Sequence, residues 1–430
     1  MRRVVIALLL GAFLLAIGSG CATKAQPQSG ARWWKGNLHT HSLWSDGDDY
    51  PEMIAQWYRN QGYHFLSVSD HNVMQSGERW FTLKGGTNGR GNGVALRKYM
   101  DAWGPDWVTL RSRGETNEVR LRPLDEYRGR IEEPGRFLLI AGEEITDRHL
   151  NAPLHMNAHN LRFPIEAQGG SNVVDVLQRN TDAVLAQRKA TGQPMFPHIN
   201  HPNFGWAITA EELMQIRGEQ FFEVYNGHPA VHNEGDAGHP GTERMWDIAL
   251  TWRLAFLNLG PMFGLAVDDG HHYHTNDVQL SNAGRGWVQV RAKSLRVEDL
   301  IAALEAGDFY ASSGVELRDV RRHGDRLDVE VQPTPGTQYR IEFIGTRRNF
   351  NPTRSPLTST TGIPLRVSQR YSPDVGTVLA VVDGTTASYR LHGDELYVRA
   401  RITSSKPKPN PGRPGEMEAA WTQPLIPISP

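Results

Sequence analysis

Short apolar segments and helix-like segments alternate along the chain as far as residue 306. Strands are predicted at 33–38, 65–69, 137–141, 195–202, 221–226 and 262–267. Helices are predicted at 51–61, 171–190, 209–216, 241–257 and 297–306. This alternation indicates an α/β protein with a parallel sheet, and the number of units favours a sheet that closes into a barrel.

Two parts of the chain depart from this alternation. Residues 73–135 show no clear period, so we predict an insertion loop with one helix near the mouth of the site. From about residue 314, apolar and polar residues alternate with a period of two, as they do in half-buried antiparallel strands. We therefore predict a barrel over 33–314 and a small antiparallel β-rich accessory domain over 315–430. Fifteen of the 17 histidines precede residue 275, which places the chemistry in the first domain.

The N-terminus is typical of an export signal. A basic start at Met1-Arg2-Arg3 is followed by an apolar stretch and by small residues before Cys21, the only cysteine. This arrangement resembles a bacterial lipoprotein signal over 1–21, with lipidation at Cys21 and a polar linker over 22–32. The alternative is an ordinary cleaved signal. We expect an exported protein of the cell envelope or periplasm that meets the membrane only through its lipid anchor.

Two histidines stand two residues apart at the end of the first predicted strand. Alternate side chains of a strand share a face, so His39 and His41 would hold one metal ion between them. Asp269-Gly270-His271 repeats the spacing after a later strand. Other ligand-type residues follow successive strands, and the complete predicted set is His39, His41, Asp46, His71, Glu144, His155, His201, Asp269 and His271. Imidazoles and carboxylates suit zinc, manganese or iron, and this number of ligands favours two or three divalent metal ions.

Further polar residues near these strand ends are candidates for supporting roles. Asp70 is expected to orient a ligand histidine. His198 is expected to point away from His201, with catalytic support as the alternative, and the same alternative applies to His272. Asn226 and Tyr273 would line the pocket or simply pack. Arg148 and Arg285 would meet a phosphate or be solvated.

The ordered set resembles the PHP family, named for polymerase and histidinol phosphatase. The resemblance covers residues 33–315 and rests on the motifs His39-x-His41 with Ser45-Asp46-Gly47, Ser69-Asp70-His71-Asn72, Gly142-x-Glu144, His155, His201-Pro202 and Asp269-x-His271. Arg285-Gly286-Trp287 and residues 309–314 are similar to a branch of metal-dependent phosphoesterases. That branch also has relatives that cleave carbamate or amide bonds.

The resemblance implies a distorted (β/α)7 TIM-like barrel with three metal positions. Their expected ligands are, in order, His39, His41, Glu144 and Asp269; Glu144, His155 and His201; and Asp46, His71 and His271. Glu144 is preferred to Glu143 by the spacing of the motif. His149 and His159 remain alternatives to His155.

The function expected from this set is hydrolysis of a small phosphorylated substrate by metal-bound water. The alternative is cleavage of a carbamate, amide or ester bond on the same metals, because the ligands do not discriminate between them. Arg, Lys or backbone N–H groups that converge on the pocket would favour a phosphate substrate, whereas an apolar pocket lined by Phe204 or Trp206 would favour the alternative. A third hypothesis is a non-catalytic metal-binding envelope lipoprotein. The formal net charge of -1 provides no basic field, so no nucleic-acid partner is expected.

Overall fold

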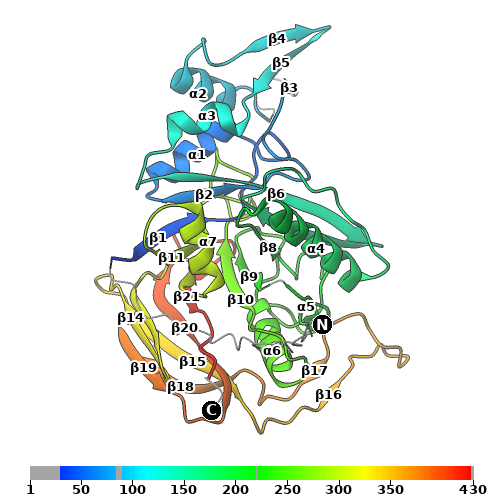
Figure 1. Ribbon diagram of the computed structural model, residues 1–430, viewed down its shortest axis with the longest axis vertical. Coiled ribbons are helices and arrows are strands. Elements are labelled where there is room, and N and C mark those ends of the chain that lie inside the picture. The colour runs from blue at the N-terminus through cyan, green and yellow to red at the C-terminus, as the bar shows by residue number, and fades with distance from the viewer. Residues whose placement is uncertain (1–29, 84–89, 219, 428–430) are drawn as a thin grey trace, which may run out of the picture.

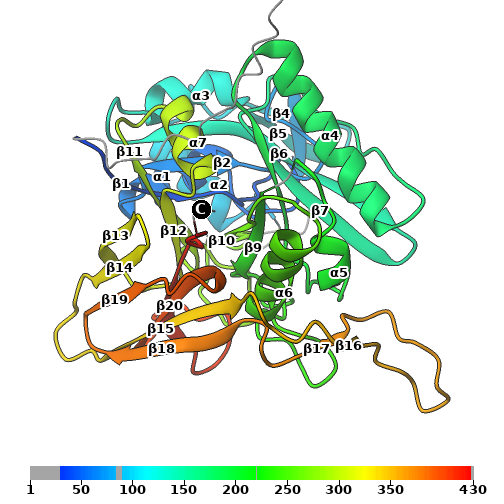
Figure 2. The same ribbon diagram turned by 60° about the horizontal axis from the view of Figure 1, so that its bottom comes forward.

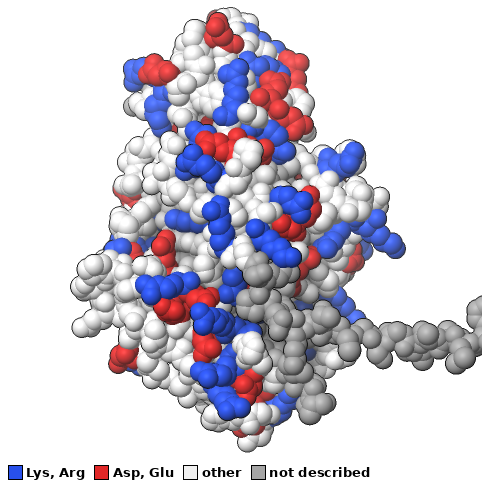
Figure 3. Space-filling model, turned by 60° about the vertical axis from the view of Figure 1, so that its left-hand side comes forward, with Lys and Arg blue, Asp and Glu red and all other residues white. Residues whose placement is uncertain are grey.

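The computed structural model describes residues 30–83, 90–218 and 220–427. The predicted signal peptide with Cys21 and most of the predicted linker lie outside the described residues. Within the described parts of the chain, no helix is both long and apolar enough to cross a membrane. Figure 3 shows acidic and basic side chains interspersed on the face that it draws.

The fold is built on one mixed sheet of 13 strands (Figure 1), in the order β10-β9-β8-β7-β6-β2-β1-β11-β12-β21-β20-β15-β18. Its first seven strands are β1 (Arg32–Asn37), β2 (Phe65–Val68), β6 (Leu138–His149), β7 (Ala152–His159), β8 (Phe196–Ile199), β9 (Phe221–Asn226) and β10 (Phe263–Val267). β1, β2 and β6 pair in parallel, as do β8, β9 and β10. β7 is antiparallel to both of its neighbours, so the expectation of an all-parallel sheet is wrong at this strand.

The two ends of this seven-strand run meet beyond the strands themselves. Thr40 forms a bridge with Gly270, and the amide of His41 donates to the carbonyl of Gly270 over 3.0 Å. The amide of Asp269 donates to the carbonyl of His39 over 3.1 Å. These bonds join the segments that follow β1 and β10. Because β1 and β10 share no ladder in the described residues, the closed barrel stays a prediction.

Five of the described helices follow the predicted pattern: α1 (Pro51–Asn60), α4 (Val173–Thr191), α5 (Ala210–Leu213), α6 (Thr242–Ala255) and α7 (Val297–Glu305). α5 begins with a capping box, in which Thr209 and Glu212 each accept the other's backbone N–H. Figure 2 shows α4 and α6 on the same side of the molecule, beside the strands that they connect.

Residues 73–135 are more ordered than predicted. They form β3 (Arg79–Leu83), α2 (Val94–Trp103), β4 (Leu110–Arg113), β5 (Thr116–Leu121) and α3 (Leu124–Ile131). The three strands make a separate antiparallel sheet that projects at the top of Figure 1. All residues of β4 are exposed, so no apolar pattern marked this strand in the sequence.

The remaining strands pair antiparallel, as predicted from about residue 314. They are β11 (Trp287–Ala292), β12 (Phe309–Ser312), β13 (Leu317–His323), β14 (Arg326–Val331), β15 (Tyr339–Arg347), β16 (Arg354–Ser355), β17 (Arg370–Tyr371), β18 (Thr377–Asp383), β19 (Thr386–Arg390), β20 (Glu395–Pro407) and β21 (Met417–Thr422). Of these, β11 and β12 were not predicted from the sequence. β12 pairs with β21, so the large sheet continues without a break into the predicted accessory domain. Figure 2 brings the layer of β15, β18 and β20 forward.

Candidate metal centre

The turn after β1 brings two buried imidazoles to a pair of carboxylates. The Nε2 atoms of His39 and His41 both lie 3.1 Å from Oδ1 of Asp269. The same two atoms lie 3.4 and 3.2 Å from Oε2 of Glu144. Both histidines have 0% exposed area. The segments after β1 and β10 and the long strand β6 therefore converge on one buried point.

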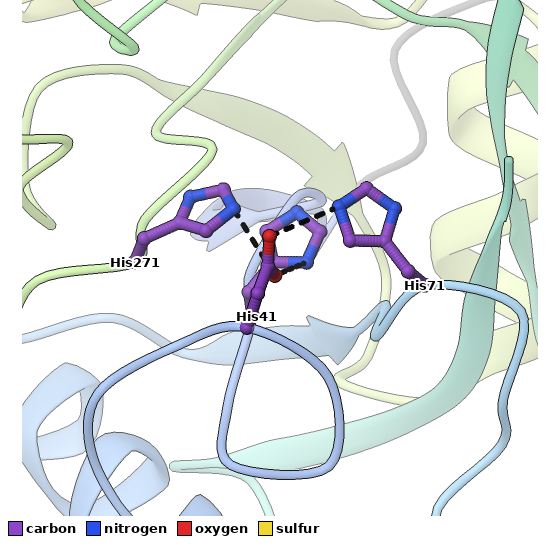
Figure 4. Close-up of side chains that lie close together, drawn as sticks. His41, His71 and His271 are labelled. Carbon is purple, nitrogen blue, oxygen red and sulfur yellow. Dashed lines mark ion pairs between the residues drawn. The ribbon is translucent and has the colours of Figure 1, made fainter. Parts of the chain in front are cut away.

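Asp46 gathers a second group on the more open side of this point (Figure 4). Its carboxylate lies 3.5 Å from Nδ1 of His41, 3.5 Å from Nε2 of His71 and 3.3 Å from Nε2 of His271. The rings of His41 and His271 stack with centroids 4.1 Å apart. Nδ1 of His71 also lies 2.9 Å from Oε2 of Glu144, which connects this group to the first.

The β6–β7 hairpin supplies the third group. Glu144 and Thr146 share one face of β6, and Thr146 pairs directly with His155 of β7. Nδ1 of His155 therefore comes within 2.9 Å of Oε1 of Glu144, and Nε2 of His201 lies 3.6 Å from the same oxygen. Glu143 points to the opposite face, where it accepts the backbone N–H of Ile165.

All nine sequence-predicted residues thus belong to one continuous cluster, and the grouping differs from the expected one in detail. Potential metal-binding sets with ligand atoms within 4.8 Å of one another are His41, Asp46, His71 and His271; His39, His41 and Glu144; His39, His201 and Asp269; His71, Glu144 and His155; and His39, His198 and Glu223, the last of which contains two residues outside the predicted set. His41 joins the Asp46 set, and His71 joins the Glu144 set. The assignment of each residue to a particular ion stays a prediction.

Unpartnered buried atoms in the cluster fit divalent cations. His39 Nε2, His41 Nε2, Glu144 Oε2 and His155 Nδ1 are buried without a hydrogen-bond partner. Each such atom costs about 1–3 kcal/mol when nothing satisfies it. A metal ion accepts a lone pair from every one of these atoms, and the mixture of imidazole nitrogens and carboxylate oxygens is the donor set of zinc, manganese and iron sites.

The electrostatics of the cluster favour the ligand form at His41 and Glu144. Burial, together with the nearby His271 and His71, lowers the pKa of His41 to about 4, so its imidazole is neutral at pH 7. Burial opposes ionisation of Glu144, yet the adjoining histidines, led by His71 and His39, hold its pKa well below the usual range. Neutral imidazoles and ionised carboxylates are the forms that bind metal. In contrast, burial is outweighed by the neighbouring carboxylates, which raise the pKa of His39, His71, His201 and His271, so these imidazoles would release protons on binding a cation.

Glu223 is a residue of the site that was not predicted from the sequence. It lies on β9 with 0% exposed area and accepts from His39 Nδ1 at 2.6 Å and from the amide of His201 at 2.7 Å. It therefore orients two of the predicted ligands. The available signal was a single carboxylate within the apolar segment Phe221–Asn226, because a buried charge requires partners.

His198 lies behind the cluster. One of its ring nitrogens is 3.0 Å from Glu223 and the other is 2.9 Å from His159, and the side chain is fully buried. It faces away from His201, as expected, and both nitrogens are occupied, so this geometry does not support a catalytic role. His272 accepts the amide of Ser281 at Nδ1 over 3.3 Å and packs against that loop.

Asp70 does not contact a ligand histidine, in contrast to the expectation. It accepts the amide of Ser42 at 2.8 Å, the hydroxyl of Ser45 at 2.7 Å and the side-chain amide of Gln75 at 2.8 Å. It thereby shapes the loop that leads from His41 to Asp46. Its influence on the cluster passes through the backbone of this loop.

Two other predicted pocket residues act as braces. The side-chain amide of Asn226 donates to Asp269 Oδ2 at 3.1 Å and to Glu223 at 2.8 Å. The hydroxyl of Tyr273 donates to the carbonyls of His41 and Gly270 at 2.9 and 2.7 Å. Asn226 therefore positions a carboxylate, and Tyr273 holds the bridge between the segments after β1 and β10.

The expectation that Arg285 meets a phosphate is wrong. Its side chain has 0% exposed area and donates to the carbonyls of Gly227, Leu280 and Asp277 at 2.8, 2.6 and 2.8 Å. These hydrogen bonds connect the loop after β9 to the loop after β10. Arg148 is exposed on β6, on the same face as Glu144, and its phosphate role stays a prediction.

Aromatic side chains border one side of the cluster. The ring of Phe204 lies 5.1 Å from that of His201 and 6.1 Å from that of His155. Trp206 stacks against His239 at 3.9 Å and His232 at 4.5 Å. Phe204 therefore places an apolar surface next to the predicted ligands, whereas Trp206 packs against two histidines of the loop that follows β9.

Comparisons with known proteins find similarity at the level of structure. No family model and no curated protein matches the sequence. A solved two-domain protein from Bacteroides vulgatus, described as containing a predicted PHP-like metal-dependent phosphoesterase, is 15% identical with a TM-score of 0.40, over 93% of this chain and 97% of that one. A second, from Bifidobacterium adolescentis and named as a metal-dependent phosphoesterase, is 16% identical with a TM-score of 0.27, over 55% and 87%.

Proposed function

We propose that this chain is a metal-dependent hydrolase of the PHP family that cleaves phosphate esters. The observation that carries the proposal is the convergence of nine ligand-type side chains, Glu144 among them, in one cluster with four buried ligand atoms left without a hydrogen bond. In this proposal the seven strands from β1 to β10 form the distorted (β/α)7 barrel of the family, and Cys21 carries the lipid anchor of an exported protein.

The side chains of the site have different roles: some would bind cations, and others position these ligands. His39, His41 and Asp269 would hold a buried cation, and Glu144 would contribute its Oε2 beside His39 and its Oε1 beside His155. Asp46, His71 and His271 form the more open position. Bound divalent ions supply Lewis acidity and lower the pKa of water to near neutrality. Glu223, Asn226 and Asp70 keep these ligands and their loop in place.

A second candidate is hydrolysis of a carbamate, amide or carboxylic ester on the same centre. The ring of Phe204 beside His201 favours it, because an apolar wall suits an uncharged acyl substrate better than a phosphate. The occupation of Arg285 by backbone carbonyls removes one phosphate-binding candidate and points the same way.

A substrate panel separates these functions. The metal-loaded protein is assayed with nitrophenyl phosphate, bis(nitrophenyl) phosphate, nitrophenyl acetate and a nitrophenyl carbamate. We expect turnover of a phosphate ester and a loss of at least about 10³-fold in kcat for His39→Ala, since a ligand of the buried cation is gone. The exposed His323→Ala on β13 is the matched control. Turnover of the acetate or carbamate alone would favour the second candidate, and bound metal with no turnover would favour a non-catalytic role.

A further inference from the structure

A cavity of about 260 Å³ lies beside the metal centre, between two segments that are far apart in the sequence. The loop after β9 lines it with Asn226, His228 and Glu234. The segment that joins β20 to β21 lines it with Arg413 and Glu416. The predicted accessory domain therefore contributes directly to a cavity next to the proposed active site.

The inner wall of this cavity touches the metal centre. Asn226 donates to the predicted ligand Asp269 at 3.1 Å and also lines the cavity. The ring of His228 meets that of the predicted ligand His271 edge to face, with centroids 5.5 Å apart. Asn226 and His228 therefore each line the cavity and contact a predicted ligand.

His228 presents a hydrogen-bond donor at this boundary. Its Nδ1 accepts the backbone N–H of Ala230 at 3.1 Å. A neutral imidazole that accepts at Nδ1 carries its proton on Nε2, so Nε2 donates. This donor belongs to a ring that both lines the cavity and packs against His271.

The charged side chains of the cavity wall are all paired, in one case with Lys408, which does not line the cavity. Glu416 Oε1 lies 3.2 Å from the ammonium of Lys408, and its Oε2 accepts the amide of Gly412 at 2.7 Å. Arg413 lies 2.7 Å from Glu234. The wall is polar but has no uncompensated charge from these four groups. A neutral group with hydroxyls fits such a wall, because an apolar group would displace water without replacing its hydrogen bonds.

We infer that this cavity is the subsite for the leaving alcohol of the substrate, and that this alcohol is neutral and polyhydroxylated. The inference rests on the proposed phosphoesterase function. In the reaction, the oxygen of water bonds to phosphorus, the ester P–O bond breaks, and the alcohol oxygen leaves with a proton. The Nε2–H of His228 is placed to hydrogen-bond that departing oxygen.

The first test uses the unaltered protein and matched substrates. Inositol 1-phosphate and cyclohexyl phosphate share a six-membered ring and an alkyl ester, and differ in their hydroxyls; methyl phosphate lacks the ring. We expect kcat/KM for inositol 1-phosphate to exceed that for cyclohexyl phosphate by about tenfold or more, which corresponds to about 1.4 kcal/mol of differential binding. Equal values, or a preference for cyclohexyl phosphate, would overturn the inference and leave the proposed function intact.

The second test fills the cavity. A Cβ at Gly412 would lie 3.5 Å from Glu416 Oε2 and 3.6 Å from the carbonyl of Gly227, so Gly412→Leu fits at its base and extends its side chain into the space. We expect its KM for inositol 1-phosphate to rise about tenfold, with methyl phosphate kinetics and bound metal unchanged. The control is Gly129→Leu on α3, where an added Cβ meets no atom within 4 Å.

The outcomes of the two tests are distinguishable. Unchanged kinetics of Gly412→Leu on both substrates would exclude the cavity as the subsite while phosphoesterase activity stands. If Gly412→Leu fails to fold, the substrate preference of the unaltered protein decides. If the metal-loaded protein hydrolyses none of the three phosphates, the subsite is overturned, and the proposed function falls with it only if nitrophenyl phosphate and bis(nitrophenyl) phosphate are not hydrolysed either.

Discussion

At the scale of single residues, Glu144 is the junction of the cluster. Its Oε1 faces His155 and accepts the side-chain amide of Asn200 at 2.8 Å, while its Oε2 faces His39, His41 and His71. One carboxylate can therefore serve two cation positions and reduce the repulsion between them. Glu223 plays a different part, because it holds the ligands from behind without joining the cluster of unpartnered atoms.

The role of Glu223 predicts a specific loss of metal affinity. In Glu223→Ala, His39 Nδ1 and the amide of His201 lose their acceptor, and both ligands are free to reorient. We expect metal affinity to fall about 10–100-fold, and Glu223→Gln to lose less because it keeps one acceptor oxygen. Chelator competition measures the affinity directly. Wild-type affinity in a folded Glu223→Ala protein would contradict the assigned role.

At the scale of elements, the antiparallel β6–β7 hairpin supplies predicted ligands, and the insertion is attached to the fold through α1. β6 runs to His149, well past the predicted end of the strand at 141, and its register with β7 places His155 opposite Thr146. The hairpin thus delivers two predicted ligands from one supersecondary unit. The insertion is fastened to the fold by α1, where Glu52 accepts the hydroxyl of Tyr99 at 2.6 Å and the indole N–H of Trp107 at 3.0 Å.

Glu52 predicts a pH dependence of stability. Burial raises its pKa from 4.5 to about 7. Between these values the unfolded chain ionises while the folded carboxyl stays protonated, so the free energy of unfolding falls as pH rises and levels off above pH 7. The difference amounts to about 3 kcal/mol. Denaturant unfolding at pH 4.5, 6 and 7.5 should show this slope, and Glu52→Gln should flatten it. An identical slope in the variant would show that another group is responsible.

At the scale of the whole molecule, the structure is continuous across the predicted domain boundary at residue 314. β12 pairs with β21, so part of the sheet of the first region is completed by the last described strand. Arg399 of β20 is buried and places its guanidinium 2.8 Å from Asp247 of α6. Tyr397 also donates to Asp247 at 2.8 Å. These contacts make the C-terminal sheet a structural wall of the site-bearing region.

This continuity predicts that the first region does not fold alone. A chain ending at residue 314 exposes the β12 edge and leaves Asp247 buried without its cation, a loss of about 3–5 kcal/mol for the ion pair alone. We expect this truncated protein to be aggregated or to lack a cooperative thermal transition. The full-length protein is the control and should unfold in one main transition. A soluble, cooperative and metal-binding truncated protein would establish residues 315–430 as an independent accessory domain.

The sequence by itself determined the order of six strands and five helices between β1 and α7, and the ligand-type residues that follow the strands. It missed β7 and β11, as well as the strands of the insertion. Period-two and helical spacing are local properties, and the paired histidines after β1 and β10 are visible without a fold. It also anticipated the antiparallel C-terminal strands. It did not reveal the sheet of the insertion, because β4 buries nothing and leaves no apolar pattern.

Only the tertiary structure decided which side chains meet. Asp70 and Arg285 sit in motifs that suggest the site, yet their partners are loop atoms, because hydrogen bonding depends on distances that the sequence does not contain. Glu223 joins His39 across 184 residues of chain. The cavity between the loop after β9 and the segment before β21 exists because two segments that are distant in the sequence pack together. No local sequence pattern predicts this contact.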